Sequence, residues 1–149
     1  MSTRTRTGTG AVVEVLGGLR ALKREIRTTA DLAEAVETGL PLASLGIVVR
    51  RVAGEGRQAT ELTHRVVPKT TLQRRHDRLS PDESQRLERL ARLTALAERV
   101  WDDPEPAHEF LVSPQPQLGG ERPVDLIRTD LGTRRVEDLL WSLEYSLPV

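Results

Sequence analysis

The sequence predicts an all-α protein with two parts, a helix-turn-helix domain followed by a smaller helical domain. Along most of the chain, apolar residues recur every three or four positions, which is the spacing of one buried helix face. Serine, threonine and proline stand where several of these segments begin, as they do at helix starts. No strand is expected, because the one apolar run that could form a strand, Gly46–Val49, lies within a helical period.

The first ten residues differ in composition from the rest of the chain. After Met1 they are only Ser, Thr, Arg and Gly, so they offer nothing to a core. We therefore expect residues 1–10 to form a disordered, solvated tail. Arg4 and Arg6 leave an alternative open, because short basic arms of some DNA-binding domains enter the minor groove.

Residues 11–79 are predicted to form the first domain, with four helices ahead of its most basic segment. Leu19 is expected on the buried face of the first helix. Thr28 or Thr29 is a suitable N-cap for the second. Pro41 suits the first turn of the third, because its missing N–H would have no partner there. The expected helices span residues 11–22, 29–37, 41–53 and 58–65.

The segment Lys69–Arg78 follows a break at Val67-Pro68 and has one strongly apolar residue, Leu72. A short helix, a tight turn and a second helix that is nearly all polar and basic are typical of a helix-turn-helix, whose second helix enters the major groove of DNA. Gln can pair with adenine and Arg with guanine, while Lys and hydroxyl groups hold phosphates. The predicted DNA contacts are Lys69, Thr70, Thr71, Gln73, Arg74 and Arg75.

Residues 80–149 are predicted to form the second domain, and its first helix has the clearest start signal in the chain. Ser80 is the N-cap, proline follows at the first helical position, and Glu83 completes a capping box. Apolar residues continue at helical spacing as far as Trp101, so we expect one long helix that bridges the two domains.

The remaining helices of the second domain are shorter. One follows Asp103, and two more are expected from Pro123 and Asp130, after glycines at 119 and 120 that allow a sharp approach. The last helix places four apolar residues at i, i+3, i+4 and i+7, which is one buried stripe. That stripe consists of Val136, Leu139, Leu140 and Leu143.

Trp141 lies off this stripe and stands close to an apolar end of the sequence. Tyr145 follows it within about one helical turn of 3.6 residues, and the sequence closes on Leu147, Pro148 and Val149. Aromatic and apolar side chains gathered outside a core are the composition of an interface centre. We therefore expect this end to bind a partner, with packing at the rim of the core as the alternative for Trp141.

The net charge of zero hides a division between the two parts. Residues 1–79 carry 14 Lys and Arg against 8 Asp and Glu, a net +6, and residues 80–149 carry 8 against 14, a net −6. The basic part is therefore the candidate for binding nucleic acid, and the acidic part for binding protein. Aromatic residues make up only 3% of the chain, which argues against binding nucleic acid by stacking bases on aromatic side chains.

Catalysis, metal binding and membrane insertion find no support in the sequence. His64, His76 and His108 are scattered, cysteine is absent, and no Gly-x-Gly pair follows a strand as a phosphate-binding loop would. We therefore expect no catalytic residue, no metal and no cofactor. No apolar run approaches the roughly 18 residues of a membrane helix, and no signal peptide is evident, so we expect a soluble, cytoplasmic protein.

An ordered series of short motifs extends across residues 12–149. These motifs are Gly39-Leu-Pro41, Lys69-Thr-Thr-Leu-Gln-Arg-Arg75, Leu79-Ser-Pro-Asp-Glu-Ser84, Leu118-Gly-Gly120, Pro123-x-Asp125-Leu126, Glu137-Asp-Leu-Leu140 and Glu144-Tyr145. In this order they closely resemble the MbcA/ParS/Xre antitoxins. The chain has Thr70 and Ser146 where this family commonly has arginine and glycine.

The resemblance implies an Xre-like helix-turn-helix domain that binds operator DNA and a C-terminal domain that binds a toxin. The implied partner is a RES-domain toxin, an enzyme that consumes NAD. In such type II pairs the C-terminal region of the antitoxin covers the active site of the toxin and blocks access of NAD, and the complex represses its own promoter. The predicted toxin-binding residues are Arg122, Pro123, Trp141, Glu144, Tyr145, Ser146, Leu147, Pro148 and Val149.

A second interpretation stays open, namely a stand-alone helix-turn-helix repressor whose acidic part dimerises or binds a small effector. Repressors read palindromic sites through two-fold symmetry, so both interpretations predict a homodimer. The antitoxin interpretation adds a larger hetero-oligomer with the toxin. Neither involves a membrane.

Overall fold

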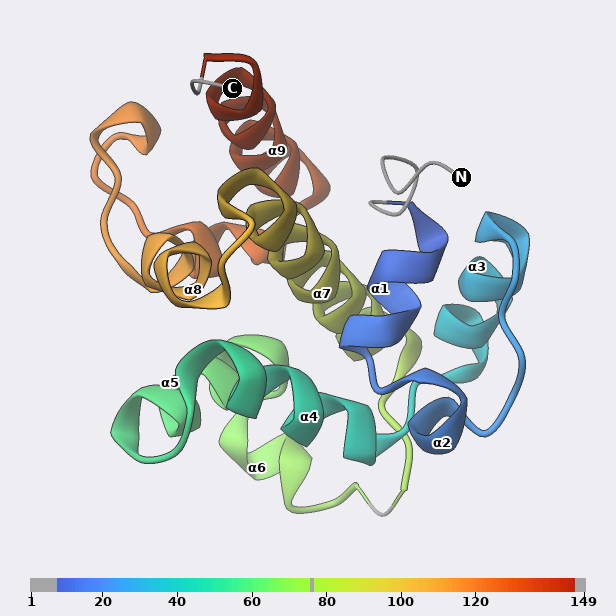
Figure 1. Cartoon of the computed structure of the whole chain (residues 1–149). Coiled ribbons are helices and arrows are strands. Elements are labelled where there is room, and N and C mark those ends of the chain that lie inside the picture. The colour runs from blue at the N-terminus through green and yellow to red at the C-terminus, as the bar shows by residue number, and fades with distance from the viewer. Residues whose placement is uncertain (1–7, 76, 147–149) are drawn as a thin grey trace.

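The computed structural model describes residues 8–75 and 77–146, and within them every regular element is a helix (Figure 1). The β-type pairing found there is an isolated bridge between Pro41 and Arg78. The prediction of an all-α fold is therefore confirmed. The elements are α1 (Thr9–Val15), α2 (Gly18–Leu22), α3 (Thr29–Thr38), α4 (Leu42–Ala53), α5 (Arg57–Val66), α6 (Lys69–Leu72), α7 (Pro81–Trp101), α8 (Pro104–Val112), η2 (Pro116–Leu118), η3 (Pro123–Arg128) and α9 (Asp130–Ser146), where η marks a 3-10 helix.

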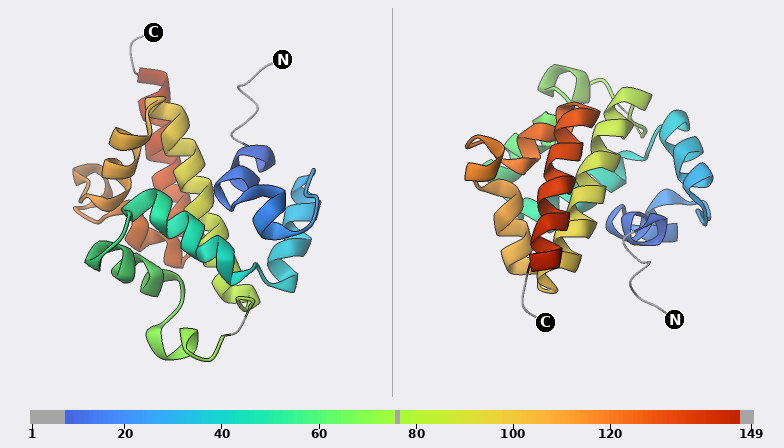
Figure 2. Two further views of the ribbon diagram at one scale, coloured as in Figure 1. Left: turned by 60° about the horizontal axis from the view of Figure 1, so that its bottom comes forward. Right: turned by 90° about the horizontal axis from the view of Figure 1, so that it is seen from above.

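Helix α7 passes through the middle of the molecule, with α1 and α3 packed against one side and α8 and α9 against the other (Figures 1 and 2). Its start has the predicted capping box. The Ser80 hydroxyl accepts a hydrogen bond from the Glu83 N–H at 3.2 Å, and the Glu83 carboxylate accepts one from the Ser80 N–H at 2.8 Å. A second capping box, at Thr28, starts α3.

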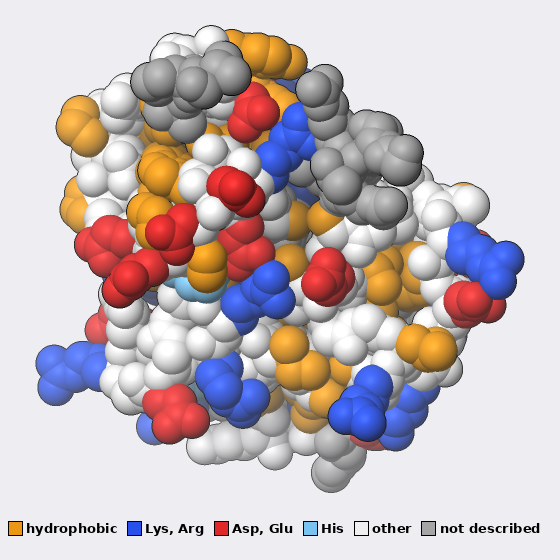
Figure 3. Space-filling model, in the orientation of Figure 1, with side chains coloured by type: hydrophobic (Ala, Val, Ile, Leu, Met, Phe, Trp, Pro, Cys, Tyr) orange, Lys and Arg blue, Asp and Glu red, His pale blue; other side chains and the backbone are white. Residues whose placement is uncertain are grey.

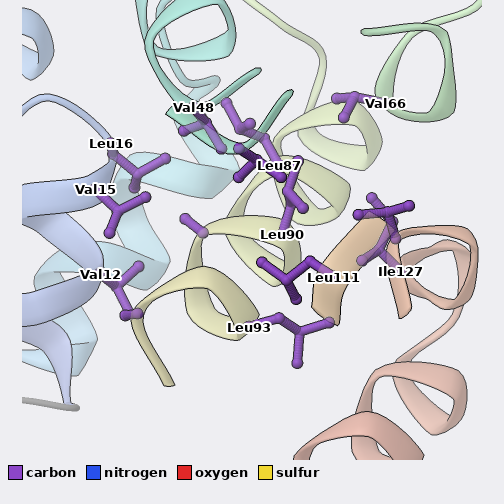
Figure 4. Close-up of a cluster of buried hydrophobic side chains, with 14 of the residues drawn as sticks. Val12, Val15, Leu16, Val48, Val66, Leu87, Leu90, Leu93, Leu111 and Ile127 are labelled. Carbon is purple, nitrogen blue, oxygen red and sulfur yellow. The ribbon is translucent and has the colours of Figure 1, made fainter. Parts of the chain in front are cut away.

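The buried face of α7 joins the two halves of the chain through one hydrophobic core. Leu87, Leu90 and Leu93 are fully buried, in one cluster with side chains from α1, α4, α5, α8 and η3 (Figure 4). Full burial of one such leucine contributes roughly 1.5–3 kcal/mol. Because this cluster continues across the middle of the sequence, damage to α7 affects both halves.

Helices α7 and α9 lie side by side and point in the same direction. Arg92 Nη1 is 3.3 Å from Glu137 Oε2, and Arg99 Nε is 3.6 Å from Glu144 Oε2. From the first pair to the second, the residue number rises by seven on α7 and also by seven on α9. In antiparallel helices it would rise on one helix and fall on the other. The end of α9 therefore lies beside the end of α7, at the top of Figure 1.

The helix predicted over residues 11–22 is in fact two short helices, α1 and α2, and that prediction was wrong. Gly17 between them has φ +110°, a conformation that glycine adopts readily and side-chain-bearing residues rarely do. A Cβ atom at Gly17 would also collide with the side chains of Ala21 and Ile47. After this turn Leu19, which was expected to face inward, is 64% exposed.

The predicted stripe of α9 faces the core. Val136 and Leu140 are fully buried, and Leu139 and Leu143 are half-buried and pack against the core. Gly132 is also buried, and η3 approaches it closely, because a Cβ atom at Gly132 would lie 2.5 Å from the carbonyl oxygen of Leu126. The helix predicted to begin at Pro123 is η3 itself, which has 3-10 rather than α geometry.

Candidate functional site

Helices α5 and α6 form a helix-turn-helix unit at the lower end of the molecule (Figure 1). Val67 and Pro68 join them, and Val67 is fully buried. Arg86 of α7 donates from Nε to the carbonyl oxygen of Val66 at 2.8 Å. The His64 ring forms a hydrogen bond with the carbonyl of Val67 at 3.0 Å. Side chains of α5 and α7 therefore hold the backbone of the turn between the two helices.

The exposed side chains of α6 and of the turn after it are mainly those predicted to contact DNA. Leu72 anchors this segment, because it packs against the hydrophobic core. The segment therefore presents polar and basic groups on a short, anchored support. Its exposed residues are Lys69, Thr70, Gln73 and Arg74, and its half-buried ones are Thr71, Leu72 and Arg75.

The recognition helix predicted over Lys69–Arg78 is much shorter in the structure, where α6 ends at Leu72. The Gln73 N–H still bonds four residues back, to the Lys69 carbonyl, but the N–H groups of Arg74 and Arg75 bond to carbonyls three residues back, as in turns. The chain then has to reach Leu40, because the Leu79 N–H donates to the Leu40 carbonyl at 2.8 Å and the Leu79 side chain is buried. This pairing between distant residues ends the helix early.

Arg75 is the predicted DNA contact whose position differs most from the expectation. Its guanidinium donates to both carboxylate oxygens of Glu83, at 2.9 and 3.0 Å. Burial raises the pKa of Glu83, but the hydrogen bonds from Arg75 and from the Ser80 N–H lower it more, so the net pKa lies below its usual value. Arg75 thus clamps the recognition segment to the start of α7, and we assign it a positioning role.

Asp125 of η3 ties the helix-turn-helix unit to the C-terminal half. Its carboxylate accepts hydrogen bonds from Arg65 of α5 at 2.7 Å and from Arg122 at 2.9 Å. Burial raises the pKa of Asp125, but the two guanidinium groups lower it more. Arg122, a predicted toxin contact, is thus held by an ion pair within the chain, and Pro123 beside it is buried.

Glu98 of α7 makes a second connection between the halves. Arg51 of α4 donates to both of its carboxylate oxygens, at 2.9 and 2.7 Å, and the His108 ring lies 2.6 Å from one of them. Burial raises the pKa of Glu98, and the hydrogen bonds from Arg51 and His108 outweigh it, so the pKa is lowered. No short sequence pattern predicts the ion pair between Arg51 and Glu98, because the two residues are 47 positions apart.

The end of α9 presents a stacked aromatic pair at the opposite end of the molecule. The Trp141 and Tyr145 rings stack with their centroids 6.2 Å apart, and the Arg99 guanidinium lies 5.7 Å from the centre of the Trp141 ring. Glu144 pairs with the same arginine. Tyr145 itself is 83% exposed. A large aromatic side chain is thus held out to solvent by a half-buried neighbour.

The predicted toxin-binding residues do not form one cluster. Glu121, next to Arg122, lies 3.7 Å from Arg135. At about 1.5 Å of rise per residue, Arg135 is roughly 15 Å along α9 from Tyr145. Arg122 and Pro123 are therefore well separated from the aromatic end. Ser146 is exposed there, and its hydroxyl donates to the Ser142 carbonyl at 2.8 Å. Leu147, Pro148 and Val149 lie outside the described residues.

The surface charge follows the division predicted from the sequence. In Figure 3, acidic side chains gather over α8 and the end of α7, whereas Lys and Arg side chains are spread over the lower part, which α2, α4 and α5 occupy. The exposed acids of the upper region include Asp102, Asp103, Glu105 and Glu109. Such a distribution favours different partners for the two ends.

The described part of the chain has neither a membrane-spanning helix nor a cluster of metal ligands. None of its helices is both long enough and apolar enough to span a bilayer. Within the same residues, no group of three or more His, Cys, Asp or Glu side chains is arranged to hold a metal ion.

Comparison with known protein families gives two matches that follow each other along the chain. The model of the antitoxin Xre-like helix-turn-helix domain matches residues 31–92. The model of the antitoxin Xre/MbcA/ParS C-terminal toxin-binding domain matches residues 96–145. The chain belongs to the Xre/MbcA/ParS antitoxin family. The first match contains the recognition segment, and the second ends at Tyr145.

A curated relative supports this assignment to the Xre/MbcA/ParS antitoxins. The protein described as antitoxin Xre from Pseudomonas putida is 37% identical over 78 residues, which are 50% of this chain and 49% of that protein. The aligned stretch thus spans about half the length of the curated relative. The two family domains are those of a regulatory protein that acts by binding DNA and a toxin rather than by catalysis.

Proposed function

We propose that this chain is a type II antitoxin that neutralises a RES-domain, NAD-consuming toxin and represses its own promoter in the cytoplasm. The observation that carries the proposal is the position of the two candidate surfaces. The recognition segment lies at the lower end of Figure 1, and the aromatic end of α9 lies at the upper end. One molecule can therefore hold DNA and a toxin at the same time without the two partners colliding.

The toxin is proposed to bind the end of α9. A tyrosine that is mostly exposed and stacked on a half-buried tryptophan is a preorganised anchor, and Tyr and Trp are enriched among residues that dominate binding energy. We propose that Tyr145, with the residues that follow it, enters the active-site opening of the toxin and blocks NAD. Trp141, Glu144 and Ser146 then line the contact, whereas Arg122 and Pro123 contribute by shaping η3.

Operator DNA is proposed to meet α6 and the turn after it. Gln73 and Arg74 are exposed and have the chemistry to read base edges, while Lys69 and Thr70 suit phosphate oxygens. Thr71 keeps its predicted role with a partly covered side chain. A short recognition segment reads few bases, so we propose that a homodimer, or a larger assembly with the toxin, supplies two copies to a palindromic operator.

Residues 79 and 80 remain our proposed functional boundary, with DNA binding before it and toxin binding after it. Structurally α7 belongs to both parts, because its buried leucines contact helices from each. The boundary therefore marks a change of partner and not a hinge.

Co-expression with the reading frame next to this gene tests the proposal. The full chain and a version cut after Leu143 are compared for growth and for cellular NAD. We expect the full chain to rescue growth and NAD, and the shortened chain to fail. Operator binding of the shortened chain is the control, since α6 is far from the cut. If the neighbouring product is harmless, the stand-alone repressor becomes the better interpretation.

A further inference from the structure

A strip of charged and aromatic side chains runs along the line where α7 and α9 meet. From the exposed Tyr145 it passes through the stacked Trp141 to Glu137, all on one face of α9 because they are four residues apart. Arg92 of α7 then connects Glu137, at 3.3 Å, to Glu88, at 3.2 Å. The strip therefore leads from the proposed toxin anchor toward α3.

A small pocket lies where this strip reaches α3. Its volume is ≈ 220 Å³. Liquid water occupies about 30 Å³ per molecule, so a pocket of this size has room for one long side chain. Leu32 and Val36 are buried and form its apolar wall, Thr29 and Ala33 are exposed at its rim, and Glu88 supplies its charged group.

The carboxylate of Glu88 is only partly compensated within the chain. Burial raises the pKa of Glu88, Arg92 and Arg89 lower it, and the neighbouring charge of Glu137 raises it, with a net rise. Arg92 is shared between Glu88 and Glu137. A further cation from outside the chain would therefore stabilise the charged form of Glu88.

We propose that the toxin contacts this strip as well as the end of α9, and that the pocket between α3 and α7 receives a lysine or arginine side chain of the toxin. This rests on the proposed toxin binding. The aliphatic stem packs on Leu32 and Val36, and the cationic head meets Glu88, as long basic side chains do when they bury their stems. The toxin footprint then includes α3, which belongs to the helix-turn-helix match.

The dimensions fit one ordinary protein interface. Glu137 to Tyr145 is about 12 Å along α9, and Thr29 to Val36 is about 10 Å along α3, at 1.5 Å of rise per residue. A standard interface covers about 800 Å² on each partner, a patch that extends somewhat farther than these two lengths together. The partly compensated carboxylate of Glu88 complements a basic side chain of the toxin.

Filling the pocket is the direct test. Ala33→Leu adds a side chain at the rim without loss of helix propensity, and Ala30→Leu makes the same change at an exposed position of α3 outside the pocket. Affinity of the purified full chain for the toxin encoded by the adjacent reading frame is measured by surface plasmon resonance. We expect Ala33→Leu to weaken it about tenfold or more, mainly through faster dissociation, and Ala30→Leu to leave it unchanged.

Glu88→Gln provides a second variant that keeps the size of the side chain. We expect it to weaken toxin binding by a similar factor, with operator binding and melting temperature close to those of the natural chain. Normal toxin binding by both Ala33→Leu and Glu88→Gln would overturn the inference while the anchor at Tyr145 stands. If these variants lost homodimer formation and kept toxin binding, the inference would be wrong and the pocket would belong to the contact with a second copy of this chain. Failure of the unmodified chain to bind the toxin would overturn both proposals.

Discussion

The recognition segment and the aromatic end of α9 are held in place by different physical means. The first is a four-residue helix with one apolar anchor, Leu72, and its position depends on an ion pair from Arg75 to Glu83 and on hydrogen bonds from Arg86 and His64. The second is the last turn of a 17-residue helix that packs along α7, where Arg99 contacts Glu144 and Trp141. Polar contacts with single side chains therefore predominate at the surface proposed to read DNA, whereas the packing of a long helix supports the surface proposed to bind the toxin.

The common support of both regions is α7, and the largest expected effect comes from its core. Leu90→Ala should destabilise the fold by about 2–5 kcal/mol, because it removes a fully buried leucine between the two halves. Urea unfolding followed by circular dichroism measures this. Leu131→Ala is the matched control, since Leu131 is 68% exposed and its removal should change stability by less than about 0.5 kcal/mol. Equal effects would mean that α7 is not the common core.

Tyr145→Ala tests the aromatic end without changing the recognition segment. Because this side chain is mostly exposed, the melting temperature should hardly change. Toxin binding should fall by about 2 kcal/mol or more, as for an aromatic anchor at the centre of an interface. Titration calorimetry with the toxin measures the loss, and operator binding serves as the internal control. Undiminished toxin affinity would remove Tyr145 from the contact.

Arg74→Ala tests the recognition segment without changing the aromatic end. We expect operator affinity to fall by about 1–3 kcal/mol and discrimination against random DNA to decrease, because Arg74 is exposed beside α6 and free to contact bases. Fluorescence anisotropy with operator and random duplexes measures both quantities. Equal losses on the two duplexes would mean that Arg74 contacts phosphate only. Toxin binding should stay at its natural value.

Acid should weaken the attachment of the recognition segment to α7 through Glu83. The net pKa of Glu83 lies below its usual value of 4.5, so the stabilisation by Glu83 is complete above pH 4.5 and is lost as the pH falls through the lowered value. We expect the unfolding free energy of Glu83→Gln to depend less on pH below 4.5 than that of the natural chain. Urea unfolding at several pH values checks this, and parallel curves for the two proteins would contradict it.

The parts of the fold that were predicted correctly have local signals. The capping boxes at Thr28 and Ser80 each lie within four residues, and the long apolar stripe of α7 repeats at helical spacing. The incorrect parts depend on contacts between distant residues. Leu19 faces solvent because Gly17 turns the chain, at a point where a Cβ atom would collide with the distant Ile47.

The candidate site divides in the same way. Residue type and spacing suggested Lys69, Gln73, Arg74 and Tyr145 as partner contacts, and the structure leaves all four exposed, but their roles stay predictions. The positioning role of Arg75 could not be predicted from residue type and spacing, because its ion pair with Glu83 requires the chain to fold back toward α7. Asp125 was also missed as a tether, because Arg65, which it binds, is 60 residues away.

The sequence by itself determined that this protein is all-helical, that one part is basic and the other acidic, and that its motifs are those of the Xre/MbcA/ParS antitoxin family. Only the tertiary structure decided the length of the recognition helix, the clamp on Arg75, the parallel packing of α7 and α9, and the pocket at Glu88. The physical reason is range. Helix propensity and capping act over about four residues, whereas ion pairs and close packing depend on which distant residues the fold brings together.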